Sequence, residues 1–309
     1  MFYYTSDRGK ILLIIYVDDI IITSDDKQGI DDLKKYLQNS FRTKDLGKLR
    51  YFLGIEGAQS KKGINLSQRK YVLDILEETG LLGSKPMETP MDPNVILYED
   101  QGELLSNPER YCRLVGKLNY FTITRPNISF AVNVLSQFMK DHRLLHWEAV
   151  IRIVRYLKAH LGHGLLYKAN GHLRVEAYTN VDWAGSPSDR STTRYCTFLG
   201  GNLITWKSKK QTIVTRSSAE AKYRAMAHTS HELMWIKHLL KELRLVVKLP
   251  MIMHCDNQAA IYIASNPVFH EQTKHIEVDC HITCYSICFY KSSDLLCNKL
   301  GLYDIYSPT

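Results

Sequence analysis

The first forty residues alternate between apolar runs and charged segments. Two short apolar runs, residues 11–15 and 20–22, flank Tyr16-Val17-Asp18-Asp19 and predict a β-hairpin with two carboxylates at its tip. The charged segment that follows carries apolar residues at helical spacing, which predicts an amphipathic helix: Ile30, Leu33, Leu37 and Phe41. This start is typical of a mixed α/β region.

The pattern continues with two strands, a helix and a proline-rich connector. Residues 50–55 and 63–66 predict the two strands. Ser67 is expected to be the N-cap of a helix that reaches Thr79. Three prolines fall within residues 85–93 and cannot continue a helix, so we expect a connector there.

Residues 111–160 are predicted to be mostly helical, with a stop near Arg125-Pro126. The last helix of this region is expected over residues 147–160. It alternates apolar residues with four basic ones, and such a face suits either a phosphate backbone or a solvated surface: Arg152, Arg155, Lys158 and His160.

A second α/β unit is expected from about residue 173. Its predicted elements are strands at residues 175–178, 195–199, 203–207 and 212–214, a helix at 218–243 capped by Ser217 or Ser218, a strand at 251–255 and a helix at 258–264. Three meandering strands, a helix, a strand and a helix follow the order of ribonuclease H, although order alone does not establish function.

Composition narrows the class of partner and the setting. The 309 residues are 45% apolar and 23% charged, which is ordinary for globular protein and long enough for two domains. A net charge of +8 favours a polyanionic partner. No run approaches the ~20 apolar residues of a membrane span, and no secretory signal opens the chain. Seven cysteines, an odd number, are typical of reduced thiols, so we expect an intracellular protein, cytoplasmic or nuclear and not secreted.

Asp18 and Asp19 are the first candidate chemistry. Two adjacent carboxylates repel each other unless something neutralises them, and oxygen ligands of this kind suit Mg²⁺ or Mn²⁺. The alternative is an ordinary β-turn, in which Asp is a favoured residue without any function.

The residues around this pair decide between the two interpretations. Residues 11–23 resemble the catalytic hairpin of reverse transcriptases in the form used by copia-type LTR retrotransposons. Further segments resemble the same family in the same order: residues 45–55, 111–120, 124–128, 182–185, 206–211, 216–221, 255–258 and 273–277. So many matches in one order make chance an implausible explanation.

The resemblance implies a fragment of a Pol polyprotein that joins an RNA-directed DNA polymerase to a ribonuclease H. It implies a partial palm at residues 1–85, a connector and helical thumb or connection region at 86–171, a ribonuclease H-like α/β domain at 172–290 and a tail at 291–309. Both activities use two divalent ions, Mg²⁺ or Mn²⁺, and the resemblance implies Asp18, Asp19, Glu220 and Asp256 as their ligands. The implied partners are an RNA–DNA hybrid or template-primer, and an intact Pol protein in trans.

This chain departs from the family pattern at both sites. The family's third polymerase carboxylate and its fingers lie well before the hairpin, so we expect Asp18 and Asp19 alone to bind metal poorly and not to support polymerisation. In the nuclease, Asn180 replaces an acid, while Asp182, Glu220 and Asp256 are retained. The segment of the fourth acid, near residues 280–296, departs from the family. We therefore expect no nuclease activity.

Ordinary structural roles remain open for the retained acids. Glu220 lies near a helix start, where an acid is favoured by capping and by the helix dipole. Asp256 follows a predicted strand and precedes a helix, so it is a candidate N-cap.

Three alternatives concern the whole chain. It is a candidate non-catalytic nucleic-acid-binding remnant, with Trp206 as an aromatic platform beside basic residues: Lys207, Lys209, Lys210 and Arg216. A zinc module is the second alternative, since Cys280, Cys284 and Cys288 repeat every four residues near His275 and His281. The third is a chain with no stable fold, because the hairpin's apolar runs lack evident packing partners.

Overall fold

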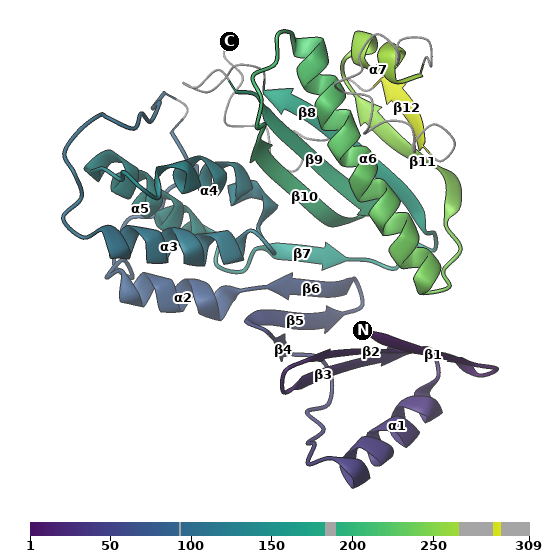
Figure 1. The fold of residues 1–309 in the computed structure, drawn as a ribbon. Helices are drawn as coiled ribbons and strands as arrows, with labels where there is room; N and C mark the ends of the chain where they lie inside the picture. Colours follow the sequence, from purple (N-terminus) through teal and green to yellow (C-terminus); the bar gives the residue numbers. More distant parts are fainter. Residues whose placement is uncertain (93, 183–189, 266–286, 292–309) are drawn as a thin grey trace.

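The computed structural model describes residues 1–92, 94–182, 190–265 and 287–291, and it is a mixed α/β structure with three sheets (Figure 1). The N-terminal sheet, a second sheet with a helical layer beside it, and a five-stranded sheet follow one another along the chain. The mixed α/β class predicted from the sequence is confirmed.

The predicted hairpin forms the N-terminal sheet together with one further strand. β2 (Gly9–Tyr16) pairs antiparallel with β3 (Asp19–Ser24), and β1 (Phe2–Ser6), which the pattern did not predict, pairs with β2. Because Tyr16 lies opposite Asp19, the turn consists of Val17 and Asp18. The predicted amphipathic helix is α1 (Lys27–Ser40), which Asp26 caps through the Gly29 N–H.

The second sheet gathers strands from distant parts of the chain. Its order is β4 (Tyr51–Phe52), β5 (Ile55–Ser60), β6 (Gly63–Ser67) and β7 (Gly164–Tyr167). The single strand predicted at residues 50–55 is wrong, because Leu53 and Gly54 both adopt positive φ and turn the chain there. The expected cap Ser67 ends β6, and Gln68 is the N-cap of α2 (Arg69–Glu78).

The predicted helical region packs beside this sheet around its own core. It contains α3 (Pro108–Phe121), α4 (Ser129–Leu135) and α5 (Leu144–Ala159), with 3-10 turns at Pro126–Ile128 and Ser136–Phe138. The stop near Arg125-Pro126 is confirmed, and the described part of the connector is not helical. The largest fully buried side chains here come from all the helices: Ile75, Leu76, Tyr111, Leu118, Phe121, Leu135, Ile153 and Leu157.

Two of the four basic residues expected on one face of α5 are bonded to other parts of the chain. Arg152 donates to the Thr89 carbonyl at 3.3 Å and forms an ion pair with Asp92 at 3.1 Å. Lys158 donates to the Leu82 carbonyl at 2.6 Å. Both interpretations are therefore wrong for these two residues: Arg152 binds the connector to the helix, and Lys158 binds the loop that precedes the connector.

The five-stranded sheet has the order β10-β9-β8-β11-β12. Its strands are β8 (Arg174–Asp182), β9 (Thr192–Leu199), β10 (Asn202–Lys210), β11 (Lys248–Cys255) and β12 (Ile287–Lys291). β8, β9 and β10 are antiparallel, whereas β11 is parallel to both β8 and β12. The strand predicted at residues 212–214 is wrong, since residues 212 and 213 form a bend and Val214 belongs to no strand, and β12 was not predicted.

Helices pack against both faces of this sheet. α6 (Ser218–Glu242) crosses β8 and β9 on one face, and α7 (Gln258–Ser265) lies beside it (Figure 1). On the other face, α4 contacts β10, and the Arg194 guanidinium lies 4.3 Å from the centre of the Phe130 ring. Buried residues of α6 and the central strands form a second core, which includes Val175, Met226, Leu233 and Met253.

Candidate functional site

Asp18 and Asp19 lie at the exposed tip of the N-terminal hairpin. Asp18 is in the turn and Asp19 is the first residue of β3. Val17, beside them, is 81% exposed and has a φ of 49°, a conformation that a β-branched residue rarely adopts. No group of three or more His, Cys, Asp or Glu side chains that could hold a metal ion is found in the described parts of the chain.

Asn180 and Asp182 lie near the end of β8, the central strand of the five-stranded sheet. Asn180 is buried, and its Oδ1 accepts the N–H of Val181 at 2.6 Å. Asp182 forms an ion pair with Arg194 at 3.4 Å. The two side chains point to the same face of β8 because they are two residues apart.

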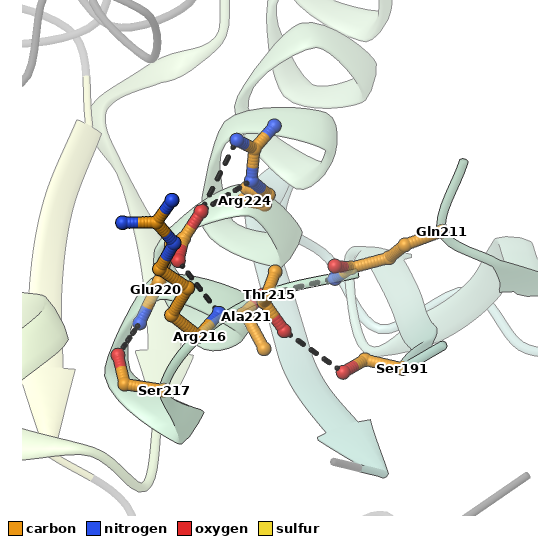
Figure 2. Close-up of polar contacts among 8 residues, drawn as sticks. All are labelled: Ser191, Gln211, Thr215, Arg216, Ser217, Glu220, Ala221 and Arg224. Carbon is orange, nitrogen blue, oxygen red and sulfur yellow. Dashed lines mark hydrogen bonds and ion pairs between the residues drawn. The ribbon is translucent and has the colours of Figure 1, made fainter. Parts of the chain in front are cut away.

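Glu220 lies in the first turn of α6, where its carboxylate is bonded to Arg224 of the same helix and to Arg216 just before it (Figure 2). Its Oε2 accepts the Arg216 N–H at 3.0 Å, and its Oε1 lies 3.2 Å from the Arg224 guanidinium. The Glu220 N–H donates to the Ser217 Oγ at 3.1 Å. This arrangement is close to a capping box, so the ordinary structural role of Glu220 is realised in this structure.

A buried polar network supports the start of α6, and sequence reasoning missed it (Figure 2). The Gln211 Nε2 donates to the Thr193 Oγ1 and to the Ala221 carbonyl, both at 3.0 Å. The Ser191 and Thr215 hydroxyls lie 3.2 Å apart. Gln211 thereby connects β9 to the residue that follows Glu220. Gln211 is only 7% exposed although it is polar and follows the end of a strand. This burial depends on the tertiary structure and has no local signal in the sequence.

Asp256 follows β11 and forms an ion pair with Lys222 of α6. It does not cap α7, because Asn257 performs that role by accepting the Ala260 N–H at 2.8 Å. The neighbouring Cys255 is buried, and burial raises the pKa of its thiol. The capping interpretation of Asp256 is therefore wrong, and its carboxylate is left to pair with Lys222.

The retained acids do not fit a divalent-ion site in this structure. Each of Asp182, Glu220 and Asp256 has a basic partner, namely Arg194, Arg224 and Lys222. A hard cation binds through several carboxylate oxygens that carry a net negative charge. A carboxylate in an ion pair offers fewer free oxygens and less net negative charge. Of the four residues expected to bind metal, Glu220 and Asp256 are ion-paired, and Asp18 and Asp19 belong to no three-member ligand group in the described chain.

The basic residues expected around Trp206 do not form one patch. Trp206 and Lys210 face the helical layer, where the indole N–H donates to the Thr122 carbonyl and the ammonium to the Gln137 Oε1, both at 2.9 Å. Lys207 and Lys209 point to the opposite face of β10 and are exposed, as is Arg216. The expectation of Trp206 as a stacking platform beside the lysines is wrong for this arrangement.

The zinc hypothesis falls mostly on residues outside the described chain. Cys280, Cys284, His275 and His281 lie there. Cys288 is described and belongs to strand β12, so it does not continue a helical repeat of cysteines.

Comparisons with known proteins agree on one family. The family described as reverse transcriptase (RNA-dependent DNA polymerase) matches residues 1–93. The retrovirus-related Pol polyprotein from transposon RE1 of Arabidopsis thaliana is 44% identical over 90% of this chain and 19% of its own length. The corresponding polyprotein from transposon TNT 1-94 of Nicotiana tabacum is 36% identical over 89% of this chain and 21% of its own length.

A shorter relative is covered almost completely. The uncharacterized mitochondrial protein AtMg00810 of Arabidopsis thaliana is 42% identical over 72% of this chain and 93% of its own length. The chain thus spans about a fifth of the polyproteins that it matches and most of this smaller protein. In the described part of the chain, no helix is long and apolar enough to cross a membrane.

Proposed function

The chain belongs to the copia-type retrotransposon Pol family, with a reverse transcriptase region at its N-terminus, and we propose that it binds nucleic acid but neither polymerises DNA nor cleaves RNA by itself. In this proposal residues 172–290 form a ribonuclease H-like unit. The sheet order β10-β9-β8-β11-β12, with α6 between the third and fourth strands in sequence, supports that assignment. Fold order by itself does not establish activity.

Asn180 is the observation on which the loss of cleavage rests. It lies in the central strand at the position where the family pattern has an acid, and its amide oxygen accepts a backbone N–H of the same strand. A neutral amide cannot bridge two divalent ions as a carboxylate does. On the polymerase side, the described chain offers no third ligand beside Asp18 and Asp19, which supports the same conclusion for polymerisation.

Nucleic-acid binding is supported by charge. The net charge of +8 favours a polyanion, and Lys207, Lys209 and Arg216 are exposed on the nuclease-like unit. The implied ligand is an RNA–DNA hybrid, which proteins bind largely through its shape and backbone.

The test combines binding and cleavage with one labelled RNA–DNA hybrid. We expect the purified chain to bind the hybrid with an affinity that falls roughly tenfold or more between about 50 and 200 mM salt. We expect no RNA cleavage in Mn²⁺, either by the natural chain or by Asn180→Asp.

The matched control is Asp256→Asn, which removes an acid without altering Asn180. Cleavage in Mn²⁺ that disappears in Asp256→Asn would contradict the proposed loss of activity. Hybrid binding that is absent or independent of salt would contradict the proposed binding function.

A further inference from the structure

The acids of the nuclease-like unit are matched one to one by basic side chains of the same chain. Asp182 pairs with Arg194 from the adjacent strand, Glu220 with Arg224 one helical turn later, and Asp256 with Lys222 from α6. Each of these negative charges is thus paired with a positive one. Since affinity for a divalent cation increases with the net negative charge of its ligands, each paired carboxylate attracts such a cation weakly.

We propose that Lys222 is a built-in counter-cation that takes the place of a divalent ion at Asp256, so that this unit is stable without metal. The inference rests on the proposed function because it concerns the same acids. It goes further in naming the group that neutralises the site and in predicting that metal does not stabilise the fold.

The Lys222–Asp256 pair connects two elements that are distant in sequence. Lys222 lies near the start of α6, and Asp256 lies 34 residues later in the turn between β11 and α7. Their side chains are only 16% and 24% exposed. The Coulomb attraction within an ion pair shielded from water is stronger than at the surface, and removing one partner leaves a costly unpaired charge.

The other surroundings of Asp256 leave Lys222 as its main partner. The other polar contact of the Asp256 side chain in the described chain is the Cys255 thiol at 3.9 Å, a weak donor. Because Asn257 caps α7, the helix does not require the Asp256 carboxylate. The ammonium of Lys222 therefore supplies the positive charge that this carboxylate needs.

The decisive variant is Lys222→Glu, which replaces the cation by a second carboxylate beside Asp256. In EDTA we expect its melting temperature to fall by roughly 5–10 °C, because one ion pair is lost and two like charges meet. Excess Mn²⁺ should restore at least half of that loss. The natural chain should show no shift between EDTA and Mn²⁺.

The matched control is Lys241→Glu, an exposed position in the last turn of the same helix. It should melt near the natural chain in both solutions. If Lys222→Glu does not fold in EDTA, two other variants measure the contribution of the ion pair to stability: Lys222→Gln, and Lys222→Gln combined with Asp256→Asn. The double variant should have the higher melting temperature, because it leaves no unpaired carboxylate.

Electron paramagnetic resonance of Mn²⁺ gives an independent readout that does not depend on activity. We expect Lys222→Glu to bind Mn²⁺ measurably, although weakly with only two carboxylates, and we expect the natural chain to bind none at this position. The inference would be overturned if the natural chain bound Mn²⁺ and Asp256→Asn did not. It would also be overturned if Mn²⁺ neither bound to Lys222→Glu nor raised its melting temperature. If the natural chain binds Mn²⁺ but does not cleave RNA, the inference about Lys222 fails while the proposed function stands. The failure of the inference can therefore be distinguished from the failure of the proposed function.

Discussion

At the scale of single residues, the alternation of side chains along β10 separates exposed charge from charge that is bonded to the helical layer. Trp206 and Lys210 are bonded to the helical layer, whereas Lys207 and Lys209 are exposed on the other face. Burial also lowers the pKa of Lys210, with Arg190 acting in the same direction. Residues that are neighbours in sequence therefore have different roles.

This separation predicts different phenotypes for neighbouring substitutions. Lys207→Ala and Lys209→Ala should each weaken hybrid binding and reduce the slope of log affinity against log salt by about 1, with stability unchanged. Trp206→Phe should lower the free energy of unfolding by about 1–2 kcal/mol, because the hydrogen bond to Thr122 is lost, and should leave hybrid affinity unchanged. Fluorescence anisotropy and urea unfolding measure the two effects, and a loss of affinity in Trp206→Phe would contradict the assignment.

At the scale of an element, the N-terminus of α5 depends on a buried neutral histidine. The His146 Nδ1 accepts the Arg143 N–H at 3.0 Å, and its Nε2 lies 3.0 Å from the Tyr98 carbonyl. Since a carbonyl only accepts, the proton is on Nε2 and the ring is neutral. Burial lowers the pKa of His146, and the nearby His142 and Arg143 act in the same direction, although the bond to Tyr98 opposes them.

The depressed pKa of His146 makes stability depend on pH with a definite sign. As the pH falls below about 6.5, the unfolded chain takes up a proton that the folded histidine resists, so stability decreases. His254 and His163, whose pKa values burial also lowers, add to the same trend. We expect His146→Gln to be less stable at neutral pH and to lose less stability between pH 7 and 5, as measured by urea unfolding. An equal loss in both proteins would refute this.

At the scale of the whole molecule, packing is uneven between the N-terminal sheet and the rest. α1 contains no buried residue, whereas α3 buries five: Tyr111, Leu114, Val115, Leu118 and Phe121. A pocket of about 480 Å³ opens between α1 and the sheet, lined by residues that include Tyr4, Ile11 and Leu33. The apolar runs of the hairpin therefore have few packing partners within the described chain.

This difference predicts the order in which regions open. Elements with few buried apolar contacts open locally at low free energy. The amide hydrogens of α1 should therefore exchange with solvent at least roughly 100-fold faster than those of α3. Hydrogen exchange followed by mass spectrometry on peptides from residues 27–40 and 108–121 measures the ratio. Equal protection of the two helices would contradict the prediction.

Most helices and the central strands were predictable from the sequence because their signals are local. The capping of α6 by Ser217 and the turn at residues 17–18 follow from side chains a few positions apart. The break at Leu53-Gly54 has a local signal in the glycine, which the strand prediction did not use. Strand β12 was not predictable, because it depends on a partner strand elsewhere in the chain. Among the candidate site residues, the ion pairs of Asp182 and Asp256 were likewise absent from any local pattern.

The sequence by itself determined the family and the presence of Asn180 where the proposed nuclease motif has an acid. The asparagine at position 180 can be identified from the sequence alone, because comparing a residue with a motif requires no three-dimensional geometry. Only the tertiary structure decided what the retained acids do, since Lys222 and Asp256 are 34 residues apart and meet only when α6 packs beside the end of β11. Charge compensation depends on distance in space, and linear order does not specify that distance.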